Sequence, residues 1–155
     1  MAGQEVPTLR IIVDTNVLMA AILRRGVVRS LILDHPGAYC TPAAAIVEIW
    51  EHREEWNRRG VDDRTLARQI VLLTNHSVTV VDSQHYGRWL LPALRWSVDT
   101  DDAPILALAL AKKNDGLWTF DQRAFDKERL PRRITLLNTA DVARLFVDAT
   151  HRGSD

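Results

Sequence analysis

The chain has 155 residues, of which 46% are hydrophobic, and its formal net charge is zero. This length suits one domain with a buried core and leaves no room for a second domain of similar size. The single cysteine, Cys40, excludes an internal disulfide framework and a zinc site built from several cysteines. We therefore expect one domain over residues 1–155, with short polar ends at 1–8 and 151–155.

The sequence predicts neither a membrane span nor a secretion signal. Residues 1–8 lack the basic start and apolar core of such a signal, and no apolar run approaches the ~18 residues that a span needs. Together with the lone cysteine, this favours a cytoplasmic protein. The neutral charge gives no global basic field, but if four carboxylates occupy one metal site, the rest of the chain carries a formal charge of +4. The composition thus permits an RNA partner.

Taken in chain order, the hydrophobic pattern alternates between strands and helices. Runs of β-branched and apolar residues predict strands at 9–13, 38–41, 77–81, 117–119 and 134–137. Apolar residues at helical spacing, with capping residues or prolines at several starts, predict helices at 16–23, 27–34, 43–59, 62–73, 83–95, 101–113 and 139–148. This alternation indicates a three-layer α/β/α sandwich around a parallel sheet, in which ligands gather beyond the carboxyl ends of the strands.

Two aspartates stand where predicted strands end. Asp14 follows the strand at 9–13, and Asp121 follows the apolar run at 117–120. Because the carboxyl ends of parallel strands meet at one edge of a sheet, both side chains are expected there. Taken alone, Asp14 is more simply interpreted as the cap of the following helix.

Glu48 is the one charged residue in the apolar segment at 43–50. A buried carboxylate without a partner costs several kcal/mol, so Glu48 is expected to pair with an arginine or to bind a metal. By contrast, Glu51, Glu54 and Glu55 lie in a run of mixed charges, and we interpret them as a solvated face.

Asp99, Asp101 and Asp102 crowd the start of the predicted helix at 101–113. Capping and the helix dipole account for one acidic residue, whereas three neighbouring carboxylates disfavour one another's ionisation unless a cation intervenes. With Glu48 and the strand-end aspartates, they form an oxygen-only set that suits Mg²⁺ or Mn²⁺. The five histidines show no metal-ligand spacing, and no serine or cysteine lies in a recognisable nucleophile motif.

Read in order, these residues resemble a known family. The matching segments are Ile-Ile-Val-Asp14-Thr-Asn16, Glu48 on a mid-chain helix, Asp99-Thr-Asp-Asp102-Ala-Pro-Ile-Leu, and Trp-Thr119-Phe-Asp121. The set resembles the PIN-domain family over most of residues 10–140. Within that family it is similar to the VapC-like ribonucleases, the toxin components of bacterial toxin–antitoxin pairs.

The resemblance implies a metal-dependent endoribonuclease of the PIN-like fold whose chemistry is carried by an acidic quartet: Asp14, Glu48, Asp102 and Asp121. It implies Mg²⁺ or Mn²⁺ as the cofactor, Asp99 as a further metal ligand, and Asn16 and Thr119 as polar residues that orient the quartet. It also implies an antitoxin that covers the site, and a homodimer. After Asp121 the aromatic residue comes at Phe125, one position later than in the commonest form of the motif, which leaves the geometry of that loop open.

Two other functions fit parts of the pattern. A receiver-like phosphoacceptor domain is also a small α/β protein with an acidic Mg²⁺ site, but it requires a lysine after its last strand, and 134–137 offers none. A catalytically silent PIN scaffold would bind RNA or protein without cleaving it. Because nothing in the sequence disables the quartet, we favour the nuclease.

Seventeen of the twenty basic residues are arginines, which suit bidentate contacts to phosphate. Candidate contacts to an RNA backbone are Arg24, Arg25, Arg29, Arg88 and Arg95. Trp89 and Trp96 could stack on bases, but we interpret them as packing residues or as part of a partner groove.

Overall fold

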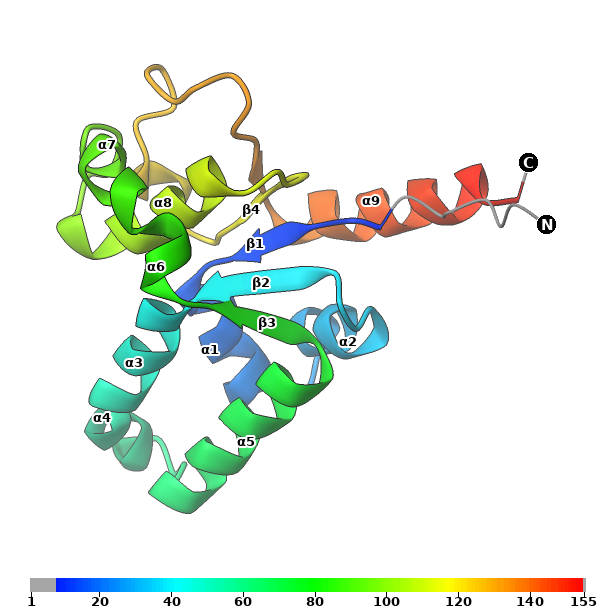
Figure 1. Cartoon of the computed structure of the whole chain (residues 1–155). Helices are drawn as coiled ribbons and strands as arrows, with labels where there is room; N and C mark the ends of the chain where they lie inside the picture. Colours follow the sequence, from blue (N-terminus) through cyan, green and yellow to red (C-terminus); the bar gives the residue numbers. More distant parts are fainter. Residues whose placement is uncertain (1–7, 155) are drawn as a thin grey trace.

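A computed structural model describes residues 8–154, which form a sheet covered by helices on both faces (Figure 1). The strands are β1 (Ile11–Val13), β2 (Tyr39–Pro42), β3 (Val78–Val81), β4 (Gly116–Trp118) and β5 (Leu136–Leu137). All neighbouring strands pair in parallel, in the order β3-β2-β1-β4-β5. Every strand therefore ends at the same edge of the sheet.

The α-helices are α1 (Thr15–Leu23), α2 (Val27–Asp34), α3 (Ala43–Glu51), α4 (Arg53–Arg58), α5 (Asp63–His76), α6 (Ser83–Tyr86), α7 (Leu90–Leu94), α8 (Ala103–Ala111) and α9 (Thr139–Arg152). Three short 3₁₀ helices join them: η1 (Gly87–Trp89), η2 (Thr100–Asp102) and η3 (Gln122–Ala124). Within residues 8–154, no helix combines the length and the apolar character that crossing a membrane requires.

Alternation along β1 divides the interior into two cores. Ile11 and Val13 pack with buried residues of α1, α2, α3, α4, α5 and α9, whereas Ile12 packs with α6, α7 and α8 on the other face. Successive strand residues point to opposite faces, so one apolar strand supplies both cores. The three-layer α/β/α architecture expected from the sequence is confirmed, and Figure 1 shows α1 and α5 on one side of the sheet and α8 on the other.

Helix α8 is apolar around its whole circumference, and seven of its nine residues are buried. A helix of this kind is stable only when it is enclosed by other elements, and α8 lies between the sheet and the layer formed by α6 and α7. Pro104 suits its first turn, where no N–H is needed. The buried helix fixes the position of the acidic turn, η2, that precedes it.

Several predicted boundaries are wrong. The helix predicted at 83–95 is divided into α6, η1 and α7, because Pro92 lacks an N–H and its ring crowds the carbonyl of Arg88. The helix predicted at 43–59 is interrupted at His52, although neither proline nor glycine marks that position. Strand β5 is shorter than predicted because the Ile134 N–H donates to the Pro131 carbonyl in a turn, 2.9 Å away. Helix α9 continues to Arg152, beyond the end predicted at Asp148 and into the short polar end of the chain.

Candidate active site

Asp14 lies where β1 ends and α1 begins, and only 6% of its surface is exposed. Its Oδ1 accepts a hydrogen bond from the Thr15 N–H at 2.7 Å, and its Oδ2 accepts one from the Thr119 hydroxyl at 2.7 Å. The helix-cap interpretation of Asp14 is thus confirmed. The same contacts hold the carboxylate in one orientation at the carboxyl edge of the sheet.

Thr119 connects the ends of β1 and β4. Its buried hydroxyl donates to Asp14 and accepts from the Asp121 N–H at 3.1 Å. The Asn16 side-chain oxygen accepts a longer hydrogen bond, of 3.4 Å, from the Phe120 N–H. Asn16 and Thr119 therefore fix the backbone that carries Asp121 relative to Asp14, whereas the Asp121 side chain is exposed.

Glu48 extends from α3 toward Asp14 and is half-buried. Its Oε2 accepts a hydrogen bond from the Thr15 hydroxyl at 3.1 Å. Thr15 thus contacts two members of the quartet, Asp14 through its N–H and Glu48 through its hydroxyl. Thr15 was not among the site residues predicted from the sequence, although its place directly after a strand-end aspartate was a usable signal.

The three aspartates before α8 have different environments. Asp99 caps η2, because its Oδ1 accepts from the Asp101 N–H at 3.1 Å. Asp102 is half-buried at the start of α8, and burial raises its pKa from 3.8 to about 6, with further increases from Asp14, Asp99, Glu48 and Asp121. Asp102 therefore lies within electrostatic range of Asp14, Glu48 and Asp121, so the quartet occupies one region of the structure.

The site concentrates negative charge. Burial raises the pKa of Asp14 despite its hydrogen bonds from Thr119 and Thr15, and it raises the pKa of Glu48, to which Asp14 and Asp101 add. The ion pairs found within residues 8–154 lie elsewhere, on the surface: Arg59–Glu55, Arg129–Asp126 and Arg144–Asp141. In the described part of the chain, the quartet thus has no arginine or lysine in an ion pair with it.

Divalent cations match this set of donors by chemistry. The donors are carboxylate oxygens, which Mg²⁺ and Mn²⁺ prefer. Burial first, and then repulsion between carboxylates, raises the pKa values of Asp14, Glu48 and Asp102, and a bound cation would offset that repulsion. Among residues 8–154, however, no three His, Cys, Asp or Glu side chains converge tightly enough to form a metal cage by themselves. The quartet is a gathered set of oxygens and not a closed coordination sphere.

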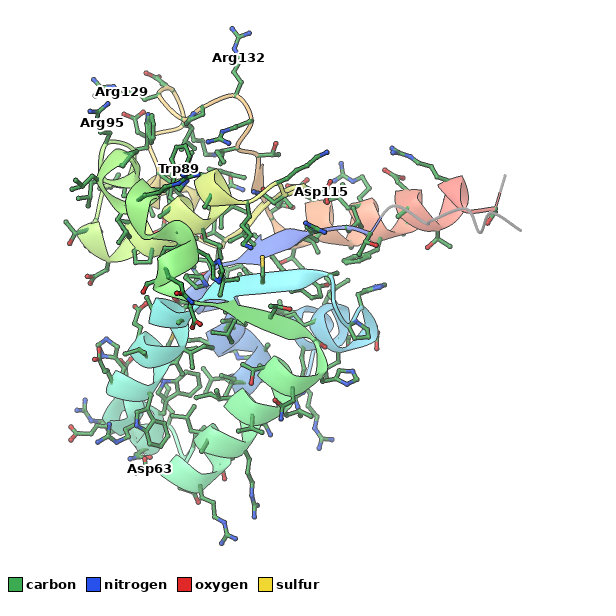
Figure 2. All side chains as sticks on the ribbon, viewed as in Figure 1. Asp63, Trp89, Arg95, Asp115, Arg129 and Arg132 are labelled. Carbon is green, nitrogen blue, oxygen red and sulfur yellow. The ribbon has the colours of Figure 1, made fainter. Side chains whose placement is uncertain are left out.

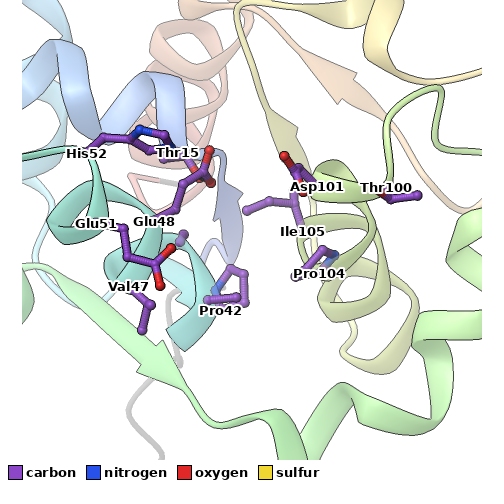
Figure 3. A pocket seen from close by; sticks show the side chains of 12 residues that line it. Thr15, Pro42, Val47, Glu48, Glu51, His52, Thr100, Asp101, Pro104 and Ile105 are labelled. Carbon is purple, nitrogen blue, oxygen red and sulfur yellow. Dashed lines mark hydrogen bonds between the residues drawn. The ribbon is translucent and has the colours of Figure 1, made fainter. Parts of the chain in front are cut away.

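A pocket of about 370 Å³ opens beside the quartet, between α3 and the start of α8 (Figure 3). Glu48 and Glu51 project into it from α3, and Asp101, Pro104 and Ile105 face them from the other side. Glu51 is exposed, as expected of a residue on a solvated face, and it also lines this pocket.

The arginines proposed as RNA contacts differ in their surroundings. Arg29 donates to the Ala21 carbonyl and to Gln69, both at 2.8 Å, so its guanidinium is engaged within the protein. Arg88 lies over Trp89, with 5.6 Å from its Cζ to the ring centroid. Arg95, by contrast, projects outward (Figure 2). Trp89 and Trp96 pack against the core that contains α8, as expected of packing residues.

The fold and the site define an α/β protein whose acidic centre lies at the carboxyl edge of a parallel sheet. This chain belongs to the PIN domain family, a family of nucleases, and the family model matches residues 12–132. The sheet order β3-β2-β1-β4-β5 also differs from the order 2-1-3-4-5 of flavodoxin-like receivers, which removes the phosphoacceptor alternative.

Solved structures of toxin–antitoxin proteins are similar to this chain in fold. VapBC2 from Rickettsia felis, bound to a DNA fragment from their promoter, matches at 13% identity and TM-score 0.59, over 84% of this chain and 98% of that one. A toxin–antitoxin complex from Klebsiella pneumoniae matches at 15% identity and TM-score 0.59, over 81% and 95%. Mycobacterium tuberculosis VapC20, a sarcin-ricin loop cleaving toxin, matches at 21% identity and TM-score 0.50, over 72% and 90%. No curated protein sequence matches the chain significantly.

Proposed function

We propose that this protein is a metal-dependent endoribonuclease and the toxin component of a toxin–antitoxin pair. The observation that supports this most strongly is the acidic centre: Asp14 is buried and held at both oxygens, and Glu48 and Asp102 lie close enough to interact with it electrostatically. So much negative charge without a basic partner costs stability, and a divalent cation would offset that cost. Membership of a nuclease family supports the same conclusion.

The residues proposed to hold Mg²⁺ or Mn²⁺ are Asp14, Glu48, Asp102 and Asp121, with Asp99 as a further ligand. A metal bound there would supply the positive charge that activates water and stabilises the leaving oxygen of a phosphodiester.

The chain's own polar groups orient this quartet. The Thr119 hydroxyl and the Thr15 N–H fix the two oxygens of Asp14, and the Thr15 hydroxyl orients Glu48. Asn16 and Thr119 hold the backbone around Asp121. Because Asp14 and Glu48 are already oriented, closure of the quartet around a metal would chiefly require the side chains of Asp102 and Asp121 to move.

Two partners follow from the family likeness and are proposed with the function. Similar folds occur in a toxin–antitoxin complex from Klebsiella pneumoniae and in VapBC2 from Rickettsia felis. We propose that this chain has a cognate antitoxin that covers the acidic centre, that it forms a homodimer, and that it acts on RNA in the cytoplasm.

RNA cleavage by the purified chain tests the proposal. We expect cleavage with Mg²⁺ or Mn²⁺, none with chelator, and a loss of at least about 100-fold in Asp14→Asn, because one metal-binding carboxylate is removed. Asp148→Asn makes the same chemical change at an exposed position on α9 and should cleave like the wild type. Cleavage that survives chelation and Asp14→Asn would refute the mechanism, and RNA binding without cleavage in either metal would indicate a silent scaffold.

A further inference from the structure

The pocket beside Glu48 has two kinds of wall. Its floor is apolar and includes Pro42, Ala45 and Ile105, whereas carboxylates stand at its sides. Its volume of about 370 Å³ falls within the range of small-molecule sites. Because Glu48 belongs to both the quartet and the pocket wall, whatever occupies the pocket lies next to the proposed cleavage site.

Two carboxylates of this pocket, Asp101 and Glu51, lie outside the quartet, and Glu51 is the one on α3. It follows Glu48 by three residues on α3, so both side chains lie on one face of the helix. Within residues 8–154, the Glu51 side chain takes part in no hydrogen bond or ion pair, whereas nearby Glu55 pairs with Arg59. In Figure 3 the Glu51 carboxylate points into the cavity.

The walls of the pocket select the part of an RNA that can enter. Carboxylates repel phosphate groups, so the sugar–phosphate backbone is disfavoured inside. An apolar floor favours a flat aromatic ring, and protein recognition of single-stranded RNA relies on inserting unstacked bases and bonding their edges. The occupant that fits is therefore a nucleobase.

The hydrogen-bonding pattern of Glu51 narrows the choice of base. A carboxylate is acceptor-only and offers two oxygens side by side. Guanine is the RNA base whose Watson–Crick edge presents two adjacent donors, N1–H and the 2-amino group. In adenine and cytosine the amino group neighbours an acceptor nitrogen, and in uracil N3–H lies between two carbonyls.

We propose that this pocket binds a guanine base of the substrate next to the scissile bond, with Glu51 accepting hydrogen bonds from guanine N1–H and from its 2-amino group. The inference rests on the proposed ribonuclease function for its substrate class, and it makes Glu51 a specificity-determining residue. The apolar surface offered to the ring comes from Val47 and Pro104, which line the pocket and are more exposed than Pro42 and Ile105.

Nucleoside binding tests the pocket without any cleavage. Guanosine, adenosine and inosine, which carry no phosphate, are titrated into the full chain with EDTA, and the methyl NMR signals of Val47 and Ile105 are followed. We expect guanosine to bind about tenfold or more tightly than adenosine, and inosine, which lacks the 2-amino group, to fall between them. Glu51→Ala should abolish this preference. Glu54→Ala removes the same charge from a residue outside the pocket and should retain it.

Cleavage of oligonucleotides that differ at one nucleotide completes the test. We expect the wild type to prefer guanosine beside the cut by about tenfold or more in kcat/KM, and Glu51→Gln to cleave the guanosine-containing and adenosine-containing RNAs with similar kcat/KM. Guanosine binding without any RNA cleavage would sink the ribonuclease function and leave the pocket assignment standing. Cleavage without a guanosine preference, or binding of N-acetylarginine amide in place of guanosine, would overturn the pocket assignment alone.

Discussion

Asp102 is held where its charge is unfavourable in the metal-free protein. Burial is the largest cause of its raised pKa, about 6 compared with 3.8 for a free side chain, and neighbouring carboxylates add to it. Below pH 3.8 the carboxyl group is protonated in both the folded and the unfolded chain. Between pH 3.8 and pH 6 the unfolded chain loses the Asp102 proton before the folded chain does, so the free energy of unfolding falls as the pH rises. This fall in stability is complete above pH 6.

Asp102→Asn should therefore stabilise the metal-free protein while abolishing cleavage. The full pKa difference overstates the gain, because the side chain is only half-buried and water screens it. We expect roughly 1 kcal/mol at pH 7. Urea unfolding in EDTA at pH 4 and pH 7 measures the effect, which should be much smaller at the lower pH, close to the pKa of 3.8 in the unfolded chain. Asp148→Asn, on the surface of α9, should leave stability unchanged at both pH values. A destabilised Asp102→Asn would show that the carboxylate stabilises the fold.

At the scale of secondary structure, the sequence predicted the strands and the acidic residues at their ends because these depend on local patterns. The pattern that ends in Asp14 places its carboxylate at the sheet edge whatever surrounds it. The role of Glu51 depends instead on how α3 packs opposite the start of α8, which a charge pattern along one helix does not reveal. The break at His52 likewise follows no local signal, whereas Pro92 could have predicted the division of 83–95.

The contact between β4 and β5 gives a prediction at this scale. A Cβ on Gly116 would lie 2.5 Å from Leu137 Cδ1 and 3.0 Å from the Thr135 carbonyl oxygen. Gly116→Ala should therefore push β5 away from β4 and destabilise the protein by about 1–3 kcal/mol. Gly87→Ala is the matched control, because nothing lies within 4 Å of its added Cβ. Urea unfolding distinguishes the two, and equal stability of both variants would contradict the packing described.

The same strand contact allows a stricter test. Leu137→Ala removes the side-chain atoms that the new Cβ would meet, although it leaves the Thr135 carbonyl in place. The double variant should therefore lose less stability than the sum of the two single losses. If the stability losses of the two single variants are additive, the strain of Gly116→Ala lies in the backbone and not in the contact with the Leu137 side chain.

Charge across the whole molecule is balanced in number but not in position. The chain carries 20 acidic and 20 basic residues, yet Asp14, Glu48, Asp102 and Asp121 gather at one edge of the sheet. The rest of the chain consequently carries a formal charge of +4, which would favour the proposed RNA partner. Because the four carboxylates lie close together, they repel one another, and a bound cation would offset this repulsion.

Metal binding should therefore stabilise the whole fold. At about 100 times its Kd, a ligand specific to the folded state adds ~2.7 kcal/mol, which for a protein of this size is roughly 5–10 °C in Tm. We expect Mn²⁺ to raise the Tm of the wild type by roughly 5–10 °C. NaCl of equal ionic strength should leave the Tm nearly unchanged. Asp14→Asn should respond to Mn²⁺ no more than to NaCl. A rise as large in Asp14→Asn would place the bound metal elsewhere.

Asp102→Asn then distinguishes relief of repulsion from simple ligand binding. If Mn²⁺ stabilises the fold by offsetting the crowded carboxylates, a variant that has already lost part of that crowding has less to gain. Its Tm in EDTA should lie above that of the metal-free wild type, and its further rise with Mn²⁺ should be smaller. If it instead gains as much from Mn²⁺ as the wild type does, Asp102 neither binds the metal nor contributes to the repulsion that the metal offsets.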